Sequence, residues 1–82
     1  MSTTVSSEQI EERVFKALEE FGVEPGEISR DAKFERIDVD SLDLVELAQI
    51  VEEEYGVQLR GEDVERLETV GQAVDLVVAR SS

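Results

Sequence analysis

Apolar residues recur at the spacing of an α-helix in three separate stretches of this chain. The first stretch carries them at positions 10, 14, 17, 18 and 21, and residues 42–55 and 70–77 show the same period. Residues 74–78 would also suit a strand, but a lone strand has no partner for its backbone. The pattern therefore predicts an all-α fold, a small antiparallel bundle of three main helices plus one short helix.

Two capping boxes mark where helices begin. Ser6 precedes Gln9 by three residues, with Ser7 as an alternative cap, and Thr69 precedes Gln72 by the same spacing. The predicted helices cover residues 7–21, 41–55 and 70–79, with one or two further turns between residues 60 and 67.

A long connection separates the first two predicted helices. Pro25 and Gly26 prevent the helix from continuing, whereas Ile28, Phe34 and Ile37 are apolar residues spaced along polar sequence. Because a structureless loop of this length is uncommon in a small domain, we expect these three side chains to anchor the connection on the core.

The length of 82 residues suits one small domain. We expect this domain to span residues 6–80, between flexible ends at residues 1–5 and 81–82. The chain shows no run of about 18 apolar residues and no charged-then-apolar leader, so neither a membrane span nor a secretory signal is predicted. We therefore expect a cytoplasmic monomer.

Composition disfavours several classes of function. The chain has no His and no Cys, so imidazole catalysis, thiolate nucleophiles, disulfides and zinc clusters lack the residues they need. Its formal net charge of −13 repels nucleic acid and anionic membranes. These properties favour a protein partner with a basic surface over nucleic acid, membrane or autonomous catalysis.

The second predicted helix has two apolar faces. With residues placed about 100° apart, one arc forms an ordinary core stripe, made of Leu44, Leu47, Ala48, Val51 and Tyr55. Leu42 and Val45 lie on the opposite side, among carboxylates. An apolar pair ringed by charge is typical of a docking surface, although single exposed apolar residues are also normal on proteins.

Ser41 stands where the connection becomes the second helix, which either Asp40 or Ser41 opens. One interpretation of Ser41 is a helix cap, because a hydroxyl there can accept a free backbone N–H. A catalytic role is disfavoured, since no His is available as a base and the neighbouring carboxylates oppose a developing negative charge. The hydroxyl could still be modified by another enzyme, because the start of a helix favours an attached phosphoryl group.

The acidic residues around Ser41 do not form a calcium loop. Asp38 and Asp40 fit its first and third positions, but Leu42, Asp43 and Gln49 stand where the motif needs an oxygen ligand, a glycine and a glutamate. No dedicated metal site is predicted.

The chain resembles the acyl carrier protein family from about residue 10 to residue 78. The family's attachment motif, Asp-Ser-Leu at the head of a helix, stands here as Asp40-Ser41-Leu42. The segments after it, residues 43–47, 52–56 and 69–75, are also typical of the family, and residues 10–14 resemble its first helix. The placement of the tripeptide within this whole pattern makes the resemblance specific.

The resemblance implies that Ser41 is the attachment site of 4′-phosphopantetheine. A phosphopantetheinyl transferase would install this arm from coenzyme A, and the arm's thiol would carry acyl groups as thioesters in fatty acid or polyketide synthesis. The reactive sulfur then belongs to the cofactor, which explains how a chain without Cys could do thioester chemistry. Carriage of an aminoacyl or peptidyl group, and an unmodified acidic adaptor with the carrier fold, remain alternatives.

The expected partners are the transferase, ketosynthase, acyltransferase and other synthase enzymes with basic docking surfaces. The residues expected to dock them are Asp40, Leu42, Asp43, Val45, Glu46 and Glu53. The residues expected to line the bundle interior, where an acyl chain could enter, are Leu44, Leu47, Val51, Val64, Leu67 and Val74.

One position departs from the family pattern. Many members have Gly two residues before the Asp of the motif, and here that position is Asp38. Because Asp adopts some of the conformations open to Gly only at a cost, the loop before Ser41 could differ locally. Peptidyl carriers often show paired glycines here, so Ile37-Asp38-Val39 favours an acyl cargo.

Overall fold

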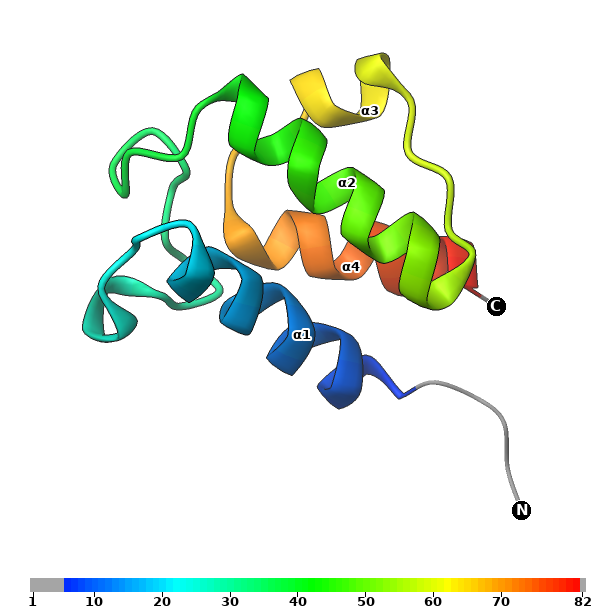
Figure 1. Cartoon of the computed structure of the whole chain (residues 1–82), viewed down its shortest axis with the longest axis horizontal. Coiled ribbons are helices and arrows are strands. Elements are labelled where there is room, and N and C mark those ends of the chain that lie inside the picture. The colour runs from blue at the N-terminus through cyan, green and yellow to red at the C-terminus, as the bar shows by residue number, and fades with distance from the viewer. Residues whose placement is uncertain (1–5, 82) are drawn as a thin grey trace.

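The computed structural model describes residues 6–81, and its regular elements are helices, with no strand among these residues (Figure 1). Its elements are α1 (Ser7–Glu20), the 3₁₀ turn η1 (Pro25–Glu27), α2 (Ser41–Tyr55), α3 (Gly61–Glu65) and α4 (Val70–Ser81). The prediction of three main helices plus one short helix is confirmed. Of the ends expected to be flexible, residues 1–5 and 82 lie outside the described residues, whereas Ser81, expected to belong to the flexible C-terminus, is the last residue of α4.

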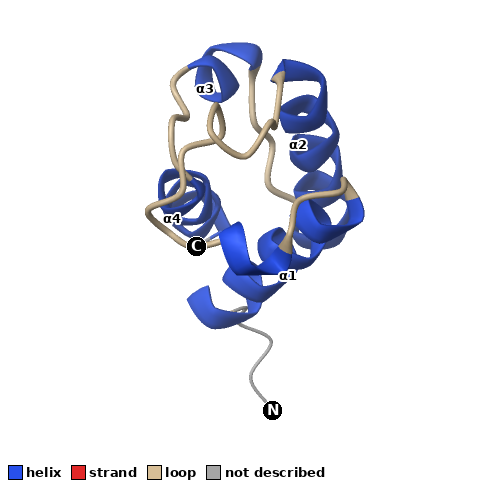
Figure 2. Ribbon diagram, turned by 90° about the vertical axis from the view of Figure 1, so that its left-hand side faces the viewer, coloured by secondary structure: helices blue, strands red, loops and turns tan. Residues whose placement is uncertain are grey.

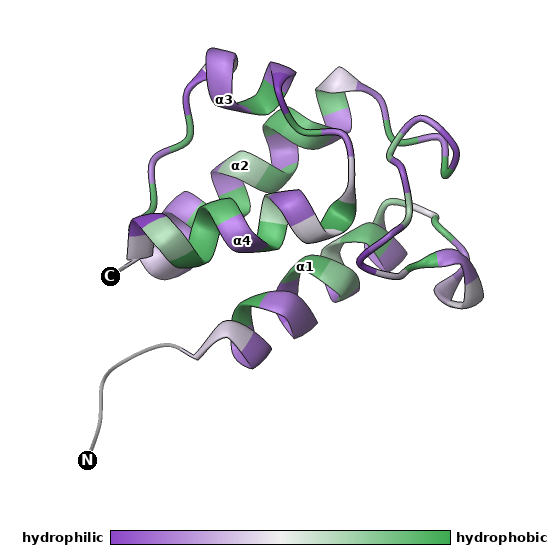
Figure 3. Cartoon of the chain, turned by 180° about the vertical axis from the view of Figure 1, so that it is seen from behind, coloured by the Kyte–Doolittle hydropathy of each residue, from purple (hydrophilic) through white to green (hydrophobic). Residues whose placement is uncertain are grey.

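The three long helices surround one interior. α1 packs directly on α4, and the two helices are antiparallel (Figure 1). On the opposite side of the bundle, α2 contacts the short α3 (Figures 1 and 2). Each long helix shows both apolar and polar residues along its ribbon (Figure 3), which is the amphipathic pattern of a bundle. No helix among the described residues is both long and apolar enough to cross a membrane.

Capping explains where α1 and α4 start. Ser6 Oγ accepts a hydrogen bond from Gln9 N at 3.2 Å, and Gln9 Oε1 accepts one from Ser6 N at 3.1 Å. Thr69 and Gln72 exchange the same pair of bonds at 3.2 and 3.3 Å. Both predicted capping boxes are confirmed, because each satisfies backbone N–H groups that the first turn leaves free.

The core consists mostly of aliphatic side chains, which come from the four α-helices and from the connections between them. Its largest fully buried members are Ile10, Val14, Leu18, Val51, Val57, Val70, Val74 and Val77. Of the predicted loop anchors, Phe34 and Ile37 are buried, whereas Ile28 is half-buried and packs at the edge. No polar or charged residue is buried among those described.

Backbone contacts tie the long connection to the start of α4. Val70 N donates to Ala32 O at 3.0 Å, and Gly71 N donates to Arg30 O at 2.9 Å. A Cβ at position 71 would lie 2.9 Å from that Arg30 oxygen, so this close approach requires glycine. The connection is therefore part of the packed fold and leads into Ser41 from a fixed direction.

An ion pair joins α3 to the end of α4. Arg80 donates from both terminal nitrogens to Asp63, at 2.6 and 2.8 Å. Asp63 also accepts the backbone N–H of Arg60 at 2.9 Å, which caps the start of α3. α4 was predicted to end near Ala79, but these contacts and a hydrogen bond from Ser81 Oγ to Val78 O extend it to Ser81.

This ion pair predicts a pH-dependent stability. The hydrogen bonds from Arg80, and then the backbone bond from Arg60, lower the pKa of Asp63 below its ordinary value. A carboxylate with a lowered pKa stabilises the fold above its unfolded pKa of about 3.9, and that contribution is lost as the pH falls through the folded pKa. Asp63→Asn should therefore lower the midpoint of thermal unfolding at pH 7.

Melting curves of both proteins from pH 7 to pH 2 check this expectation. The difference in midpoint should shrink on acidification, because wild type loses the same charge that the variant lacks. Glu65→Gln, at an exposed carboxylate of the same helix, is the control and should change little. A deficit that stays constant down to pH 2 would show that Asp63 acts through packing instead.

Candidate functional site

Ser41 is the first residue of α2, and its side chain is exposed. The cap is its neighbour Asp40, whose Oδ1 accepts the backbone N–H of Asp43 at 3.0 Å. Of the two residues that could have capped the helix, Asp40 is the one that does so. The Ser41 hydroxyl makes no hydrogen bond to any residue in the described range 6–81. An external catalyst can therefore reach this hydroxyl without breaking a helix cap.

The loop before Ser41 is held in an unusual shape. Asp38 has φ 59°, and it is the one non-glycine residue in the described range 6–81 with a positive φ. A side chain in this left-handed region costs roughly 1 kcal/mol, somewhat less for Asp. Asp38, which stands where many members of the family have glycine, therefore adopts a backbone conformation that glycine adopts easily. The buried side chains of Ile37 and Val39 on either side hold it in this conformation.

The two faces of α2 are as expected from the sequence. Leu42 is 74% exposed and Val45 is 46% exposed, and they are the large hydrophobic residues that stand out at the surface of residues 6–81. Four carboxylates are expected to contact a docked partner together with Leu42 and Val45. Of these, Asp40, Glu46 and Glu53 are exposed, and Asp43 is half-exposed. The surface formed by these six residues, the α2 face, combines an apolar centre with a carboxylate rim.

The residues expected inside the bundle are buried with one exception. The buried members are Leu44, Leu47, Val51, Val64 and Val74. Leu67 is half-buried and packs against the core from its edge. Because α3 ends at Glu65, Leu67 no longer lies on a helical face and instead borders an open cavity of about 330 Å³.

Sequence reasoning missed two features near this site. Lys33 and Arg36 line a larger cavity of about 550 Å³ beside the turn that precedes Ser41. The backbone hydrogen bonds between the connection that precedes α2 and the start of α4 were not predicted either. The first had a signal in the sequence, since Arg30, Lys33 and Arg36 are three cations at a spacing of three residues in a chain with a net charge of −13.

Comparison with known proteins gives a consistent result. The family described as "Phosphopantetheine attachment site" matches residues 14–77. The chain is also similar to the solved structure of the 3,7-dioxo-octyl actinorhodin acyl carrier protein from Streptomyces coelicolor, with TM-score 0.74 and 27% identity over 99% of this chain and 95% of that one.

Two further forms of that carrier are similar over the same shares of both chains. The 3-oxo-butyl form, an intermediate mimic from the actinorhodin polyketide synthase of Streptomyces coelicolor, has TM-score 0.73 and 26% identity. The acetyl form from the same organism has TM-score 0.72 and 28% identity.

Proposed function

This chain belongs to the phosphopantetheine attachment family, and from that membership we propose that it is an acyl carrier with its 4′-phosphopantetheine arm on Ser41. The carrier role follows from the family. The attachment residue, the cargo and the partners are the proposal. Polyketide synthesis is favoured over fatty acid synthesis because the three similar structures are actinorhodin carriers.

The single observation that carries this proposal is the exposed Ser41 hydroxyl at the start of a helix that Asp40 caps. In the loading step, the Ser41 oxygen forms a new P–O bond to the phosphate nearer pantetheine in coenzyme A. The pyrophosphate bond breaks, the nucleotide part leaves, and the serine proton goes to a base of the transferase. The resulting phosphodiester lies at the positive end of the α2 dipole, which favours its negative charge.

When bound, the arm supplies a thiol that holds acyl groups as thioesters. The cargo would enter the apolar interior between α2 and α3, where Leu44, Leu47 and Val64 are buried. Synthase enzymes would reach the arm by docking on the α2 face, one at a time, and the carrier would act as a monomer. Exposed carboxylates mainly raise the rate of encounter, whereas Leu42 and Val45 would slow dissociation.

Intact mass measurement tests the attachment. The protein is incubated with coenzyme A and a broad-specificity phosphopantetheinyl transferase, and wild type should gain one phosphopantetheinyl group per chain. A chain that gains no mass would instead be an acidic adaptor that keeps the carrier shape and only binds proteins.

Val45→Ala tests the α2 face. Truncating an apolar anchor at a docking centre costs about 1 kcal/mol, so kcat/KM for loading by the transferase should fall about fivefold. The midpoint of thermal unfolding should stay nearly unchanged, because Val45 is half exposed.

Val51→Ala is the matched control on the same helix. Val51 is 1% exposed, so its truncation should lower the free energy of unfolding by about 2 kcal/mol. While the variant stays folded, its kcat/KM should stay close to wild type. If Val45→Ala instead melts earlier and loads normally, the α2 face is not a docking surface.

A further inference from the structure

Two cations beside the proposed attachment site are not neutralised. Arg13, Arg30 and Arg80 each hold a carboxylate oxygen at 2.6 Å. Lys33 and Arg36 form no ion pair with any residue between 6 and 81, in a chain whose net charge is −13. Other exposed cations of the described residues also lack an ion pair, so Lys33 and Arg36 are distinguished by their position, close to one another and close to the proposed attachment site.

Backbone hydrogen bonds hold the two cations side by side. Arg36 N donates to Lys33 O at 2.9 Å, which closes a tight turn and brings the two Cα atoms within about 7 Å. Phe34, within the turn, is buried, and its N–H donates to Glu68 O at 2.9 Å. Lys33 and Arg36 themselves stay exposed. The pair therefore projects from an anchored backbone, and binding does not have to order this loop.

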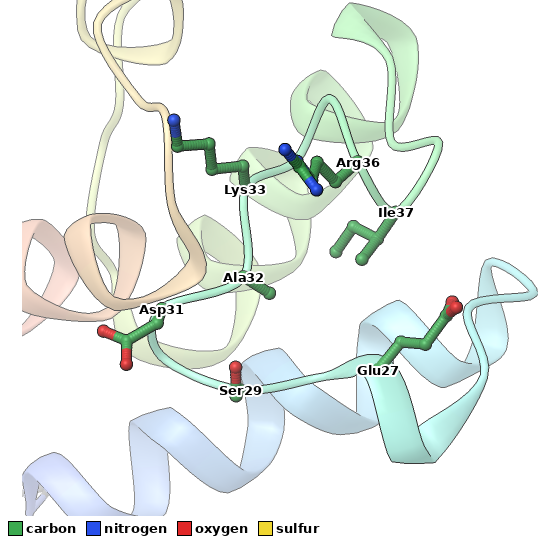
Figure 4. Close-up of a pocket in the computed structure, with 7 residues that line it drawn as sticks. All are labelled: Glu27, Ser29, Asp31, Ala32, Lys33, Arg36 and Ile37. Carbon is green, nitrogen blue, oxygen red and sulfur yellow. The ribbon is translucent and has the colours of Figure 1, made fainter.

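The two cations line the cavity of about 550 Å³ that Figure 4 shows. Lys33 and Arg36 come from its upper segment in this view, and Glu27 and Asp31 from its lower segment. Both signs of charge thus border one cavity, which we call the loop hollow; its full lining is Glu27, Ser29, Asp31, Ala32, Lys33, Arg36 and Ile37. Small-molecule sites are mostly apolar, so this charged lining better suits a protein surface.

The loop hollow lies within reach of any enzyme that acts on Ser41. Arg36 is five residues before Ser41, so their Cα atoms are at most about 18 Å apart even for an extended chain. A standard interface buries about 800 Å² on each partner, equivalent to a disc of about 16 Å radius. An enzyme centred near Ser41 therefore extends over or close to this loop.

We propose that the loop hollow is a second docking surface for the phosphopantetheinyl transferase. The transferase places an acidic side chain against Lys33 and Arg36 and a basic side chain against Glu27 or Asp31. A carboxylate rim alone permits several orientations on a basic patch, whereas charges of both signs fix one. The identity of this partner rests on the proposed loading of Ser41.

A matched pair of double variants tests this proposal. Lys33→Glu/Arg36→Glu reverses the loop cations, and Lys16→Glu/Arg66→Glu reverses two other exposed cations that have no ion pair among the described residues. Both variants change the net charge by the same amount. At low ionic strength, kcat/KM for loading should fall about tenfold in the loop variant and at most about twofold in the control.

Equal losses in the two variants would overturn the proposal, because they would reflect only the added overall charge. Melting curves verify that both variants fold, and Lys33→Gln/Arg36→Gln replaces the loop variant if it unfolds. NMR of wild type with the transferase gives an independent result: amide signals of residues 29–37 must shift together with those of α2. If wild type itself is never loaded, the proposed function fails and this docking surface fails with it.

Discussion

Replacing Ser41 with alanine should abolish loading completely, while the fold stays intact. The hydroxyl oxygen is the atom proposed to join the arm, so no partial activity is expected without it. Because Asp40 provides the cap of α2, the variant should keep its melting temperature within about 2 °C of wild type. Intact mass after incubation with coenzyme A and the transferase, with a melting curve of the same sample, measures both.

Ser7→Ala is the matched control, because Ser7 is also an exposed serine at the first residue of a helix and the preceding residue, Ser6, provides the cap. This variant should be loaded as fully as wild type. Should Ser41→Ala gain the same adduct as wild type, the arm is attached elsewhere, and peptide mapping of the adduct would locate it. Such a result would remove the assignment of Ser41 but not the family of the chain.

Replacing Leu18 with alanine should cause the largest loss of stability. Leu18 is 0% exposed and is one of the α1 residues in the buried core. A buried Leu→Ala change costs about 3 kcal/mol through lost burial and the cavity that remains. A domain of this length has about 4–12 kcal/mol in total, so a large part of its stability would disappear.

Thermal and urea unfolding measure this loss, and the midpoint of thermal unfolding should fall by about 15 °C. Leu42→Ala makes the same chemical change at a residue that is 74% exposed, and it should cost less than about 0.5 kcal/mol. Similar losses in the two variants would mean that α1 does not pack as the structure shows.

Features that depend on neighbouring residues were predictable from the sequence. Both capping boxes formed, because each needs only a hydroxyl and an amide three residues apart. The two-faced character of α2 followed from its period alone, so Leu42 and Val45 could be placed opposite the core. The identity of the cap was left open between Asp40 and Ser41, since both side chains can accept the bond that the structure gives to Asp40.

Features that depend on distant residues could not be predicted in this way. Gly71 contacts Arg30, and Arg80 pairs with Asp63 seventeen residues before it. No local sequence pattern predicts such pairs of distant residues, because they come into contact only once the helices have packed. For the same reason, Leu67 was expected inside the bundle, although the early end of α3 leaves it at the edge.

Helix capping by Asp40 leaves the Ser41 hydroxyl available for modification, and this separation has a consequence for how the prosthetic group could be replaced. One residue secures the start of α2, and the adjacent one is free to be esterified. With the arm attached as proposed, gaining or losing the prosthetic group would leave the hydrogen bond that caps α2 unbroken. Replacement of the group would then not require the start of the helix to unfold, so the same polypeptide could be loaded more than once.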